Sequence, residues 1–430
     1  MAYTAVTGGK EAIAEAEKLT EFFRLKDAQA ILTVGMIETQ LRLLVDRVMG
    51  EGGLYAPGYA ALALKQAEGD PAEAAFLLRA YRSTLPRNHV STVIDPADMR
   101  VLRRISSSFR DMPGGQVLGP TRDYTHRLLK FALREETMDD AESFLGKYRE
   151  ETSLPRERPA DMAEPATDRE GRAALPAFPK IADLLRKQGL MKAAEGGRAE
   201  EGREEEPFDI TRQKLIFPVP RSGRLQMLAR GETGAMTALA YSSMRGYGAV
   251  HPTIGELRVG YVPVAVPYPL DEGGARGEPL YIGEILLTEV ETIHPFTQNA
   301  SGEALFVPGY GLCFGQNEVK AISMAILERS LETSGTAPAQ DEEFVLLHID
   351  SVESNGFVSH LKLPHYITFQ SSLDRIRRAQ RAAGGKEAGE GAPEPQTGTP
   401  VGVKTETATA AAGKTAEADK EALTHGSRAD

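Results

Sequence analysis

Two histidines five residues apart, His360 and His365, have the type and spacing best suited to chemistry in this sequence. Five residues rotate a helical side chain by about 140° from its starting direction, and an odd spacing in a strand places side chains on opposite faces. The two imidazoles can therefore converge only if the chain turns between them, as a metal loop does. Two ligands do not close a zinc site, so others would have to come from elsewhere or from a partner. The alternative is a pair of ordinary hydrogen-bonded histidines.

A second candidate joins glycines to arginines. Gly114-Gly115 lets backbone N–H groups approach an anion closely, and Arg103, Arg104 and Arg110 precede it in a locally basic stretch. The stretch matches neither the phosphate loop that ends in Gly-Lys-Ser/Thr nor the dinucleotide fingerprint. An anion site is one interpretation, but the pattern by itself favours the alternative, a Gly-rich turn between two helices whose arginines form surface ion pairs.

Three smaller features carry weaker signals. Arg245 stands beside Gly246, where an arginine and permissive backbone come together. Asp341 begins an acidic run that suits either ribose hydroxyls or a helix N-terminus, and we favour the helix. Cys313 is the single cysteine and is flanked by apolar residues, so we expect a small buried hydrophobe. One thiol can form neither an internal disulfide nor an iron–sulfur cluster alone, which indicates a reducing cytoplasm.

The elements that position these residues begin with a mostly helical part, residues 1–134. Thr33 is predicted to cap a helix, and Asp70-Pro71-Ala72-Glu73 combines a cap, a proline at the first position and a glutamate three residues on. Asp95-Pro96-Ala97-Asp98 repeats that signal and predicts a third helix through Val101, Leu102 and Ile105.

Two segments have a different composition. Residues 135–206 are rich in proline and glutamate, so we expect a polar, largely mobile insertion in which only the stretch from Ile181 to Leu190 packs as a helix. Residues 381–430 contain no aromatic residue, and we expect a disordered tail. Most of the formal net charge of −11 lies in these two segments and says little about partners of the body.

Residues 207–380 are predicted to form a mixed α+β domain that contains the histidine pair. Pro218 with Pro220, residues 262–266 and residues 282–290 suggest strands, which prolines restrict to edges. Helices are expected after Asn317 and from Asp341 to about Val352, with Asn355-Gly356 as the stop. The predicted fold class is α+β, with a helical N-terminal part followed by a mixed part whose sheet is largely antiparallel.

The remaining composition narrows the protein class. Hydrophobic residues make up 41% and charged residues 26% of the 430 residues, which is ordinary for a globular protein. No apolar stretch is long enough for a membrane span, and the N-terminus lacks the pattern of a secretory signal. We therefore expect a cytoplasmic protein.

Several phrases, taken in order along residues 1–134 and 207–380, together resemble the PhnI family, the I subunits of bacterial carbon–phosphorus lyase. The segment 135–206 is longer than that family leads us to expect. The phrases that carry the resemblance include the histidine phrase, Gly52-Gly53, Ala63-Leu64-Lys65-Gln66-Ala67, Phe76-Leu77-Leu78-Arg79-Ala80-Tyr81-Arg82, Pro113-Gly114-Gly115-Gln116, Leu118-Gly119-Pro120-Thr121, Asp123-Tyr124-Thr125-His126-Arg127, Arg245-Gly246-Tyr247-Gly248, Gly309-Tyr310-Gly311-Leu312 and Pro338-Ala339-Gln340-Asp341-Glu342-Glu343.

The resemblance implies a transferase subunit. PhnI-like chains are associated with nucleosidase activity on ATP or GTP and, with other subunits, with displacement of adenine from ATP at ribose C1′ by an alkylphosphonate, the α-D-ribose 1-methylphosphonate 5-triphosphate synthase reaction. The implied partners are PhnG, PhnH and PhnJ, with PhnK and PhnL, and we expect neither a nucleic acid nor a membrane. The resemblance makes His360 and His365 zinc ligands near PhnJ, adds Mg²⁺ with ATP, and leaves the iron–sulfur cluster to PhnJ.

The implied chemistry suggests roles for the candidate residues. Loss of adenine passes through a cationic ribosyl centre, so a carboxylate near the sugar and an acid near the base are needed. We assign Asp123 and His126 to acid–base work and the following residues to anion binding: Arg103, Arg104, Arg110, Gly114, Gly115 and Arg245. Two alternatives stay open, a non-catalytic scaffold that completes sites on partner subunits and a metallohydrolase with a carboxylate ligand beside the histidines.

Overall fold

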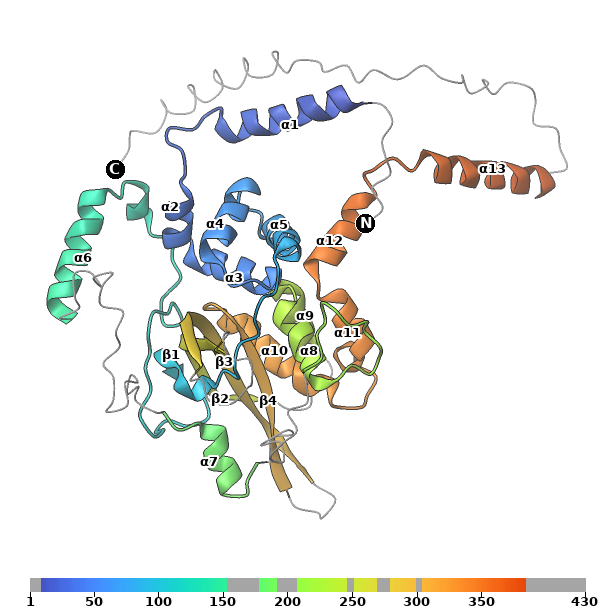
Figure 1. Ribbon diagram of the computed structural model, residues 1–430. Helices are drawn as coiled ribbons and strands as arrows, with labels where there is room; N and C mark the ends of the chain where they lie inside the picture. The colour runs from blue at the N-terminus through green and yellow to red at the C-terminus, as the bar shows by residue number, and fades with distance from the viewer. Residues whose placement is uncertain are drawn as a thin grey trace, which may run out of the picture. The chain divides into compact units, whose positions relative to one another are not determined.

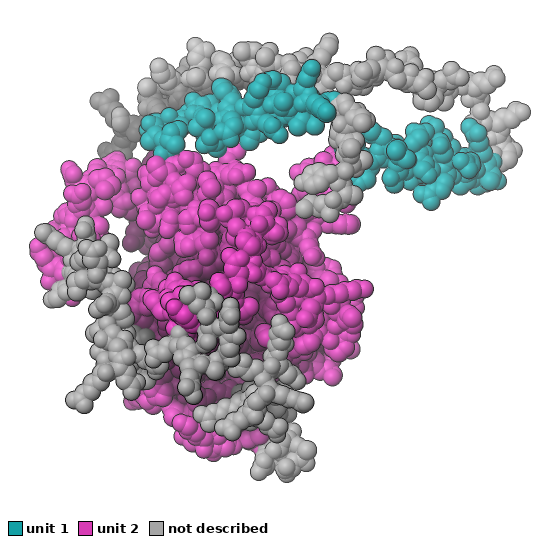
Figure 2. Space-filling view, in the orientation of Figure 1, with its two compact units in different colours: residues 1–31, 364–430 teal, residues 32–363 magenta. Residues whose placement is uncertain are grey.

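The structure is a computed structural model that describes residues 9–152, 178–191, 207–245, 251–268, 279–298 and 304–383. The chain divides into two compact units, residues 32–363 and residues 1–31 with 364–430, which Figure 2 colours separately. The smaller unit contributes two described helices, α1 (Lys10–Leu25) and α13 (Tyr366–Ala383), and neither buries a residue. Large apolar side chains such as Phe22 on α1 and Ile367 on α13 are exposed.

Four helices open the larger unit: α2 (Val34–Gln40), α3 (Arg42–Gly52), α4 (Pro57–Gln66) and α5 (Pro71–Thr84). The two predicted caps are confirmed, because Thr33 accepts a hydrogen bond from the backbone N–H of Met36 and Asp70 accepts one from Ala72. The helices share an apolar core in which Ile37, Val48, Leu64 and Leu78 are buried.

The prediction of a third helix after Asp95 is wrong. Its cap forms, because Asp95 accepts from the N–H of Ala97, but only a 3-10 turn follows, η1 (Pro96–Asp98). The chain then enters strand β1 (Arg100–Ile105). Arg104 pairs there with Arg258 of another strand. The long-range ladder of hydrogen bonds thus overrides a helix signal that is only local.

The sheet has four antiparallel strands in the order β1-β2-β3-β4, with β2 at Thr253–Val266, β3 at Leu280–Gln298 and β4 at Ala304–Phe314 (Figure 1). Together with the helices before it, this sheet confirms the α+β class. Pro263 lies in β2 beyond Tyr261, the last residue that pairs with β1. A proline is tolerated there because β2 has a neighbouring strand on one side only. The predicted strand at Pro218 and Pro220 is absent; Pro220 instead precedes helix α8.

One face of the sheet is apolar and packs on helix α10 (Glu318–Leu331). Leu257, Val259 and Val290 point to this side. Gly309 and Gly311 of β4 permit the close approach, since an added Cβ would lie 2.3 Å from the Ala325 carbonyl oxygen and 2.1 Å from that of Ala321, respectively. Because strand side chains alternate, the intervening residues form a second face, called the polar face after buried charged groups such as Glu256 and Glu289. One end of this face is apolar, with Val262 and Leu287.

Helices on either side of strands β2 to β4 in the chain complete the core. They are α8 (Arg221–Arg230), α9 (Thr233–Arg245), η3 (Pro338–Gln340), α11 (Glu342–His348) and α12 (Ser351–His360). The start at Asp341 is confirmed by its hydrogen bond from the N–H of Phe344. The stop predicted at Asn355-Gly356 is wrong, because both residues lie inside α12, which Asp350 caps. A Cβ at Gly356 would meet no atom within 4 Å, so this glycine is simply exposed in a helix.

The segment predicted as an insertion contains more helix than expected. The stretch from Ile181 does form α7 (Ile181–Lys187), which buries Ile181, Ala182 and Leu185. A second helix, α6 (Met138–Thr152), follows the short η2 (Phe131–Arg134) and buries nothing. The rest of 135–206 lies largely outside the described residues, as does the predicted tail beyond 383. Over the described ranges, every helix is too short or too polar to cross a lipid bilayer.

Candidate functional site

Arg104 is completely buried, and every nitrogen of its guanidinium group donates to a protein oxygen. Its Nε is 2.5 Å from Glu256 Oε1, its Nη1 is 2.7 Å from the Pro113 carbonyl and 2.8 Å from that of Gly115, and its Nη2 is 2.9 Å from the Pro179 carbonyl. The arginine therefore holds the glycine loop from inside. The expectation that Arg104 binds a ligand anion is corrected accordingly.

Arg103 is likewise buried and is bound to its own chain. It donates to the carboxylate of Asp123 and, at 2.5 Å, to the carbonyl of Leu118, and its Nε lies 3.1 Å from Glu318. It too has another role than the predicted one. Asp123, predicted for acid–base work, is the exposed end of this ion pair and lies 3.9 Å from Arg127.

Gly114 and Gly115 have φ values of +81° and +77°, so this turn needs residues without a side chain. A Cβ at Gly114 would lie 2.5 Å from the ring of Phe178. That ring lies 4.8 Å from the Arg104 guanidinium in a cation–π contact. The loop is thus packed between Arg104 and Phe178.

The other predicted residues lie at the surface. Arg110 is 91% exposed and pairs with its neighbour Asp111. His126 is exposed and follows Asp123 in the same segment. Arg245 is the last residue of α9 and is exposed, while Gly246, Tyr247 and Gly248 lie outside the described residues. The structure does not bring Arg245 or Arg110 to the glycine loop through any hydrogen bond or ion pair among the residues that it describes.

His360 is the last residue of α12 in the larger unit, and His365 precedes α13 in the smaller one. The chain does turn between them, since the Leu363 N–H donates to the His360 carbonyl at 2.9 Å. His360 Nδ1 contacts the Phe357 carbonyl, which orients the ring. In the described part of the chain, no three His, Cys, Asp or Glu side chains gather as metal ligands. A closed zinc site would need a ligand from beyond these residues.

A cavity of about 600 Å³ opens in the larger unit at a place that the sequence did not indicate. This volume is typical of small-molecule sites. Its apolar wall includes Leu287, Leu312 and Phe314 of the sheet, and Gly50 and Gly53 lie at the end of α3. Its charged wall contains four arginines: Arg82, Arg87, Arg212 and Arg230.

Two of these arginines carry charge that the protein neutralises incompletely. Arg79 takes both oxygens of Asp350, at 2.8 and 2.7 Å, which leaves Arg230 at 3.6 Å from the same carboxylate. Burial and the positive charge of Arg79 lower the pKa of Arg230 to about 10. Burial, followed by Arg79 and Arg87, also lowers the pKa of Arg82. Burial is the larger cause of both shifts and the neighbouring arginines add to it, so an anion in the cavity would stabilise both charges.

The rim of the cavity is fixed by a separate ion pair. Arg87 donates to Asp209 at 2.6 Å and to the Thr211 hydroxyl at 2.5 Å. The hydrogen bonds from Thr211, together with Arg87, lower the pKa of Asp209 to about 2. The pair joins segment 87–90 to segment 207–212, both of which line the cavity.

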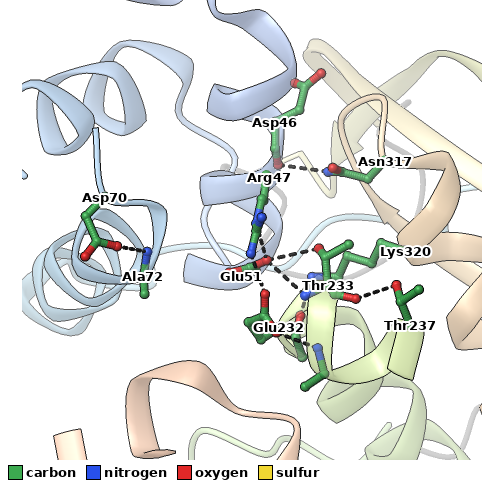
Figure 3. A network of polar contacts seen from close by, with 12 residues as sticks. Asp46, Arg47, Glu51, Asp70, Ala72, Glu232, Thr233, Thr237, Asn317 and Lys320 are labelled. Carbon is green, nitrogen blue, oxygen red and sulfur yellow. Dashed lines mark hydrogen bonds and ion pairs between the residues drawn. The ribbon is translucent and has the colours of Figure 1, made fainter. Parts of the chain in front are cut away.

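A network of polar contacts, shown in Figure 3, lies around Glu51 and Lys320, next to the end of α8. Glu51 of α3 accepts from Arg47 at 2.9 Å and from the Thr233 hydroxyl at 3.0 Å. Lys320 of α10 is fully buried and donates to the Gly231 carbonyl at 2.8 Å. Because Gly231 follows Arg230 directly, Lys320 fixes the end of α8 and with it the position of Arg230.

The polar face of the sheet is a second cluster of ionisable groups. Glu256 and Arg258 of β2, Glu289 and Glu291 of β3 and Tyr310 of β4 lie on it, and all but Tyr310 are buried. Tyr310 donates to Glu289 at 3.1 Å, and Arg258 to Glu256 at 2.8 Å. Burial raises the pKa of Glu291 to about 7.

This polar face anchors the segment that begins at Phe178. Lys180 binds Glu289 at 2.6 Å, the N–H of Ile181 donates to Glu256 at 3.1 Å, and Arg258 donates to the Phe178 carbonyl at 2.8 Å. Although burial opposes the charge of Lys180, Glu289 and Glu291 raise its pKa. The face thus serves to hold residues 178–191 on the sheet.

Sequence reasoning missed the arginine cavity because its walls come from distant segments. Arg82 stands in a quoted phrase, but its helical spacing only indicates an amphipathic helix. Arg230 ends α8 without any nearby glycine motif other than Gly231. Gly53 was the one residue whose type could have pointed to this cavity. Its φ of +67° favours glycine, and an added Cβ would lie too close to Arg82.

This chain is similar to a known protein family and to several known proteins. A family model described as bacterial phosphonate metabolism protein (PhnI) matches residues 2–383. The chain is 49% identical over 400 residues to the putative C-P lyase subunit protein HtxH of Stutzerimonas stutzeri, covering 91% of this chain and 100% of the relative. It is 45% identical to the α-D-ribose 1-methylphosphonate 5-triphosphate synthase subunit PhnI of Escherichia coli (strain K12), covering 88% of this chain and 98% of that one. The protein of the same name from Rhizobium meliloti (strain 1021) is 43% identical, over 90% of this chain and 98% of the relative.

Proposed function

This chain belongs to the PhnI family of bacterial phosphonate metabolism proteins, and we propose that it acts, as its relatives are named, as a subunit of an α-D-ribose 1-methylphosphonate 5-triphosphate synthase in the C-P lyase system. The observation that carries the proposal is the extent of the similarity. It spans nearly the whole of each relative at 43–49% identity and includes the helices, the sheet and the cavity residues of the larger unit.

The proposed reaction joins a phosphonate to the ribose of ATP. A phosphonate oxygen forms a bond to ribose C1′, the bond from C1′ to adenine breaks, and adenine leaves with a proton from an acid. Both substrates are polyanions, so the reaction needs cationic side chains close to one another, which the arginine cavity offers. We propose that the nucleotide binds there, with Mg²⁺ on its phosphates.

The reaction also needs an acid near the adenine and a carboxylate near the ribose. Asp123 and His126 stay our candidates, because both are exposed and near each other in sequence. They lie in the segment that Arg103 holds to the sheet. Arg110, Arg245 and the backbone of Gly114 and Gly115 stay candidates for contacts with the phosphonate.

The assembly and its metal are also proposals. We propose PhnG, PhnH and PhnJ, with PhnK and PhnL, as partner subunits. His360 and His365 are proposed as zinc ligands, with the remaining ligands supplied by PhnJ. Zinc content of the purified assembly tests this. Asn at either histidine should remove the metal, and acidification toward pH 5 should release it as the imidazoles are protonated. Equal zinc in the wild type and both variants would contradict it.

A reconstitution assay tests the function itself. Adenine release from ATP is measured with methylphosphonate while the subunits are added one at a time to this chain. Release that depends on this chain and on methylphosphonate is the expected result. If this chain releases no adenine from ATP even with all the other subunits present, the alternative of a non-catalytic scaffold replaces the proposal.

A further inference from the structure

We propose that the arginine cavity is a polyphosphate site formed by this chain alone, in which Arg82 and Arg230 bind the phosphates of a nucleoside triphosphate. The inference rests on the proposed function and specifies where its nucleotide binds. Every lining residue lies between Gly50 and Phe314 in the larger unit, so no partner subunit is needed to form the walls.

The first argument is the balance of charge. Arg79 and Arg230 share the carboxylate of Asp350, and Arg82 lies near both of them, since a Cβ at Gly53 would meet both Arg82 and Arg230. Arg82 forms no ion pair with any carboxylate of the described residues; its hydrogen bond goes to the Gly53 carbonyl at 3.2 Å. Three guanidinium groups around one buried carboxylate leave a positive excess that a multiply charged anion would balance.

The second argument is the state of the donors. The Nε of Arg230 is buried and has no hydrogen-bond partner within the described ranges. Its Nη2 forms a hydrogen bond only to the sulfur of Met227, at 3.7 Å, and lies 3.6 Å from the Asp350 carboxylate that Arg79 already occupies. A buried donor without an oxygen acceptor costs free energy, and a phosphate oxygen would supply that acceptor.

The third argument is that the lining of the cavity combines charged and apolar residues. Arg87 is already paired with Asp209, so it fixes the rim and does not compete for the ligand. The opposite wall is apolar, with Leu287, Leu312 and Phe314. A ligand with a polyanionic end and a flat apolar end matches both walls, which favours a nucleoside triphosphate over a small alkylphosphonate.

Rigid positioning completes the case. Lys320 holds the Gly231 carbonyl next to Arg230, and the φ of Gly53 allows Arg82 to approach the backbone. An added Cβ at Gly53 would lie 2.6 Å from Arg82 Nη1. The two arginines are therefore held before any ligand arrives, which reduces the entropic cost of binding.

Calorimetric titration of the full chain with inorganic tripolyphosphate tests the site without requiring turnover. We expect tripolyphosphate to bind more tightly than methylphosphonate. Arg82→Gln and Arg230→Gln should each raise the Kd by roughly 10- to 100-fold, because each removes a charge-assisted contact. Arg377→Gln, the same change on α13 outside the cavity, is the matched control and should leave the Kd unchanged.

The outcomes separate this inference from the proposed function. Unfolding midpoints of all variants show whether each is folded, and Arg230→Lys, which keeps the charge but loses the planar fork, should give an intermediate Kd. Equal tripolyphosphate affinity in the wild type and in folded Arg82 and Arg230 variants would overturn the site, even if the assembly releases adenine. Loss of binding in these variants would support the site, even if the assembly released no adenine and the proposed function failed.

Discussion

Arg104 and Arg230 are both largely removed from solvent, with side chains 0% and 15% exposed, yet their surroundings differ in kind. Arg104 has the carboxylate of Glu256 and three carbonyl oxygens as acceptors, so its charge and all its nitrogens are satisfied. Arg230 shares Asp350 with Arg79 and keeps a buried nitrogen without a partner in the described part of the chain. Burial alone therefore does not distinguish a structural arginine from a binding one.

The acceptors on the same chain make the difference. A guanidinium group with five donors in a fixed fork is stabilised in the interior when the fold supplies a carboxylate of its own and oxygens in matching positions. The loop at Gly114 does so for Arg104, since its turn directs two carbonyls at the side chain. The wall of α8 does not do so for Arg230. A change at Arg104 should therefore lower the free energy of unfolding, whereas a change at Arg230 should lower the affinity for an anion.

The largest effect is expected for Arg104→Gln. The change leaves Glu256 with less compensation and removes donors from the carbonyls of Pro113, Gly115 and Pro179. Breaking a buried pair costs about 3–5 kcal/mol of the free energy of unfolding. Urea denaturation measures this. Arg110→Gln, six residues further along the chain but exposed, is the control and should cost about 0–1 kcal/mol. Equal free energies of unfolding in the two variants would show that Arg104 is no more important to the fold than an exposed arginine.

A smaller effect, which depends on pH, is expected at Glu291 on the polar face beside Arg104. Its pKa rises to about 7 in the folded protein because it is buried, with Lys180, Arg186, Glu289 and Glu256 around it. The folded state therefore favours the protonated carboxyl. The stability that this proton contributes is fully present below the unfolded pKa and is lost as the pH rises through about 7.

Glu291→Gln tests this sign. The variant should gain on the order of 2–3 kcal/mol relative to the wild type as the pH is raised from 5 to 8, because glutamine stays neutral throughout. Denaturation of both proteins across that range provides the measurement. A wild type that becomes more stable than the variant at pH 8 would show instead that Lys180 and Arg186 hold Glu291 charged.

These residues also show what the sequence could predict. The caps at Thr33 and Asp70 depend on atoms two or three residues away, so the local pattern was sufficient. Asp95 carries the same local pattern, but the strand after it pairs with β2 about 150 residues later, and no local signal encodes that partner. The stop expected at Gly356 failed because an exposed helix tolerates glycine at a modest cost.

The same reasoning applies to the site. The sequence correctly places Arg103 and Arg104 near glycines. However, the oxygens that accept hydrogen bonds from Arg104 include those of Glu256 and Pro179, which lie far along the chain. Arg82 and Arg230 meet only because α5 and α8 end at one cavity. Family resemblance indicated the activity, whereas the identity of the binding arginines depends on which acceptors the folded chain leaves available.

The smallest expected change in stability is that of Arg82→Gln, and it sharpens the comparison most. The variant loses one hydrogen bond, from Arg82 to the Gly53 carbonyl, but it also removes a half-buried charge whose pKa is lowered by burial and by repulsion from Arg79 and Arg87. We expect the free energy of unfolding to change by less than about 0.5 kcal/mol, with any gain shrinking at high salt as the repulsion is screened. Denaturation at low and high ionic strength measures both. A loss comparable to that of Arg104→Gln would mean that Arg82 is a structural residue, because a side chain kept for binding contributes little to the stability of the empty protein.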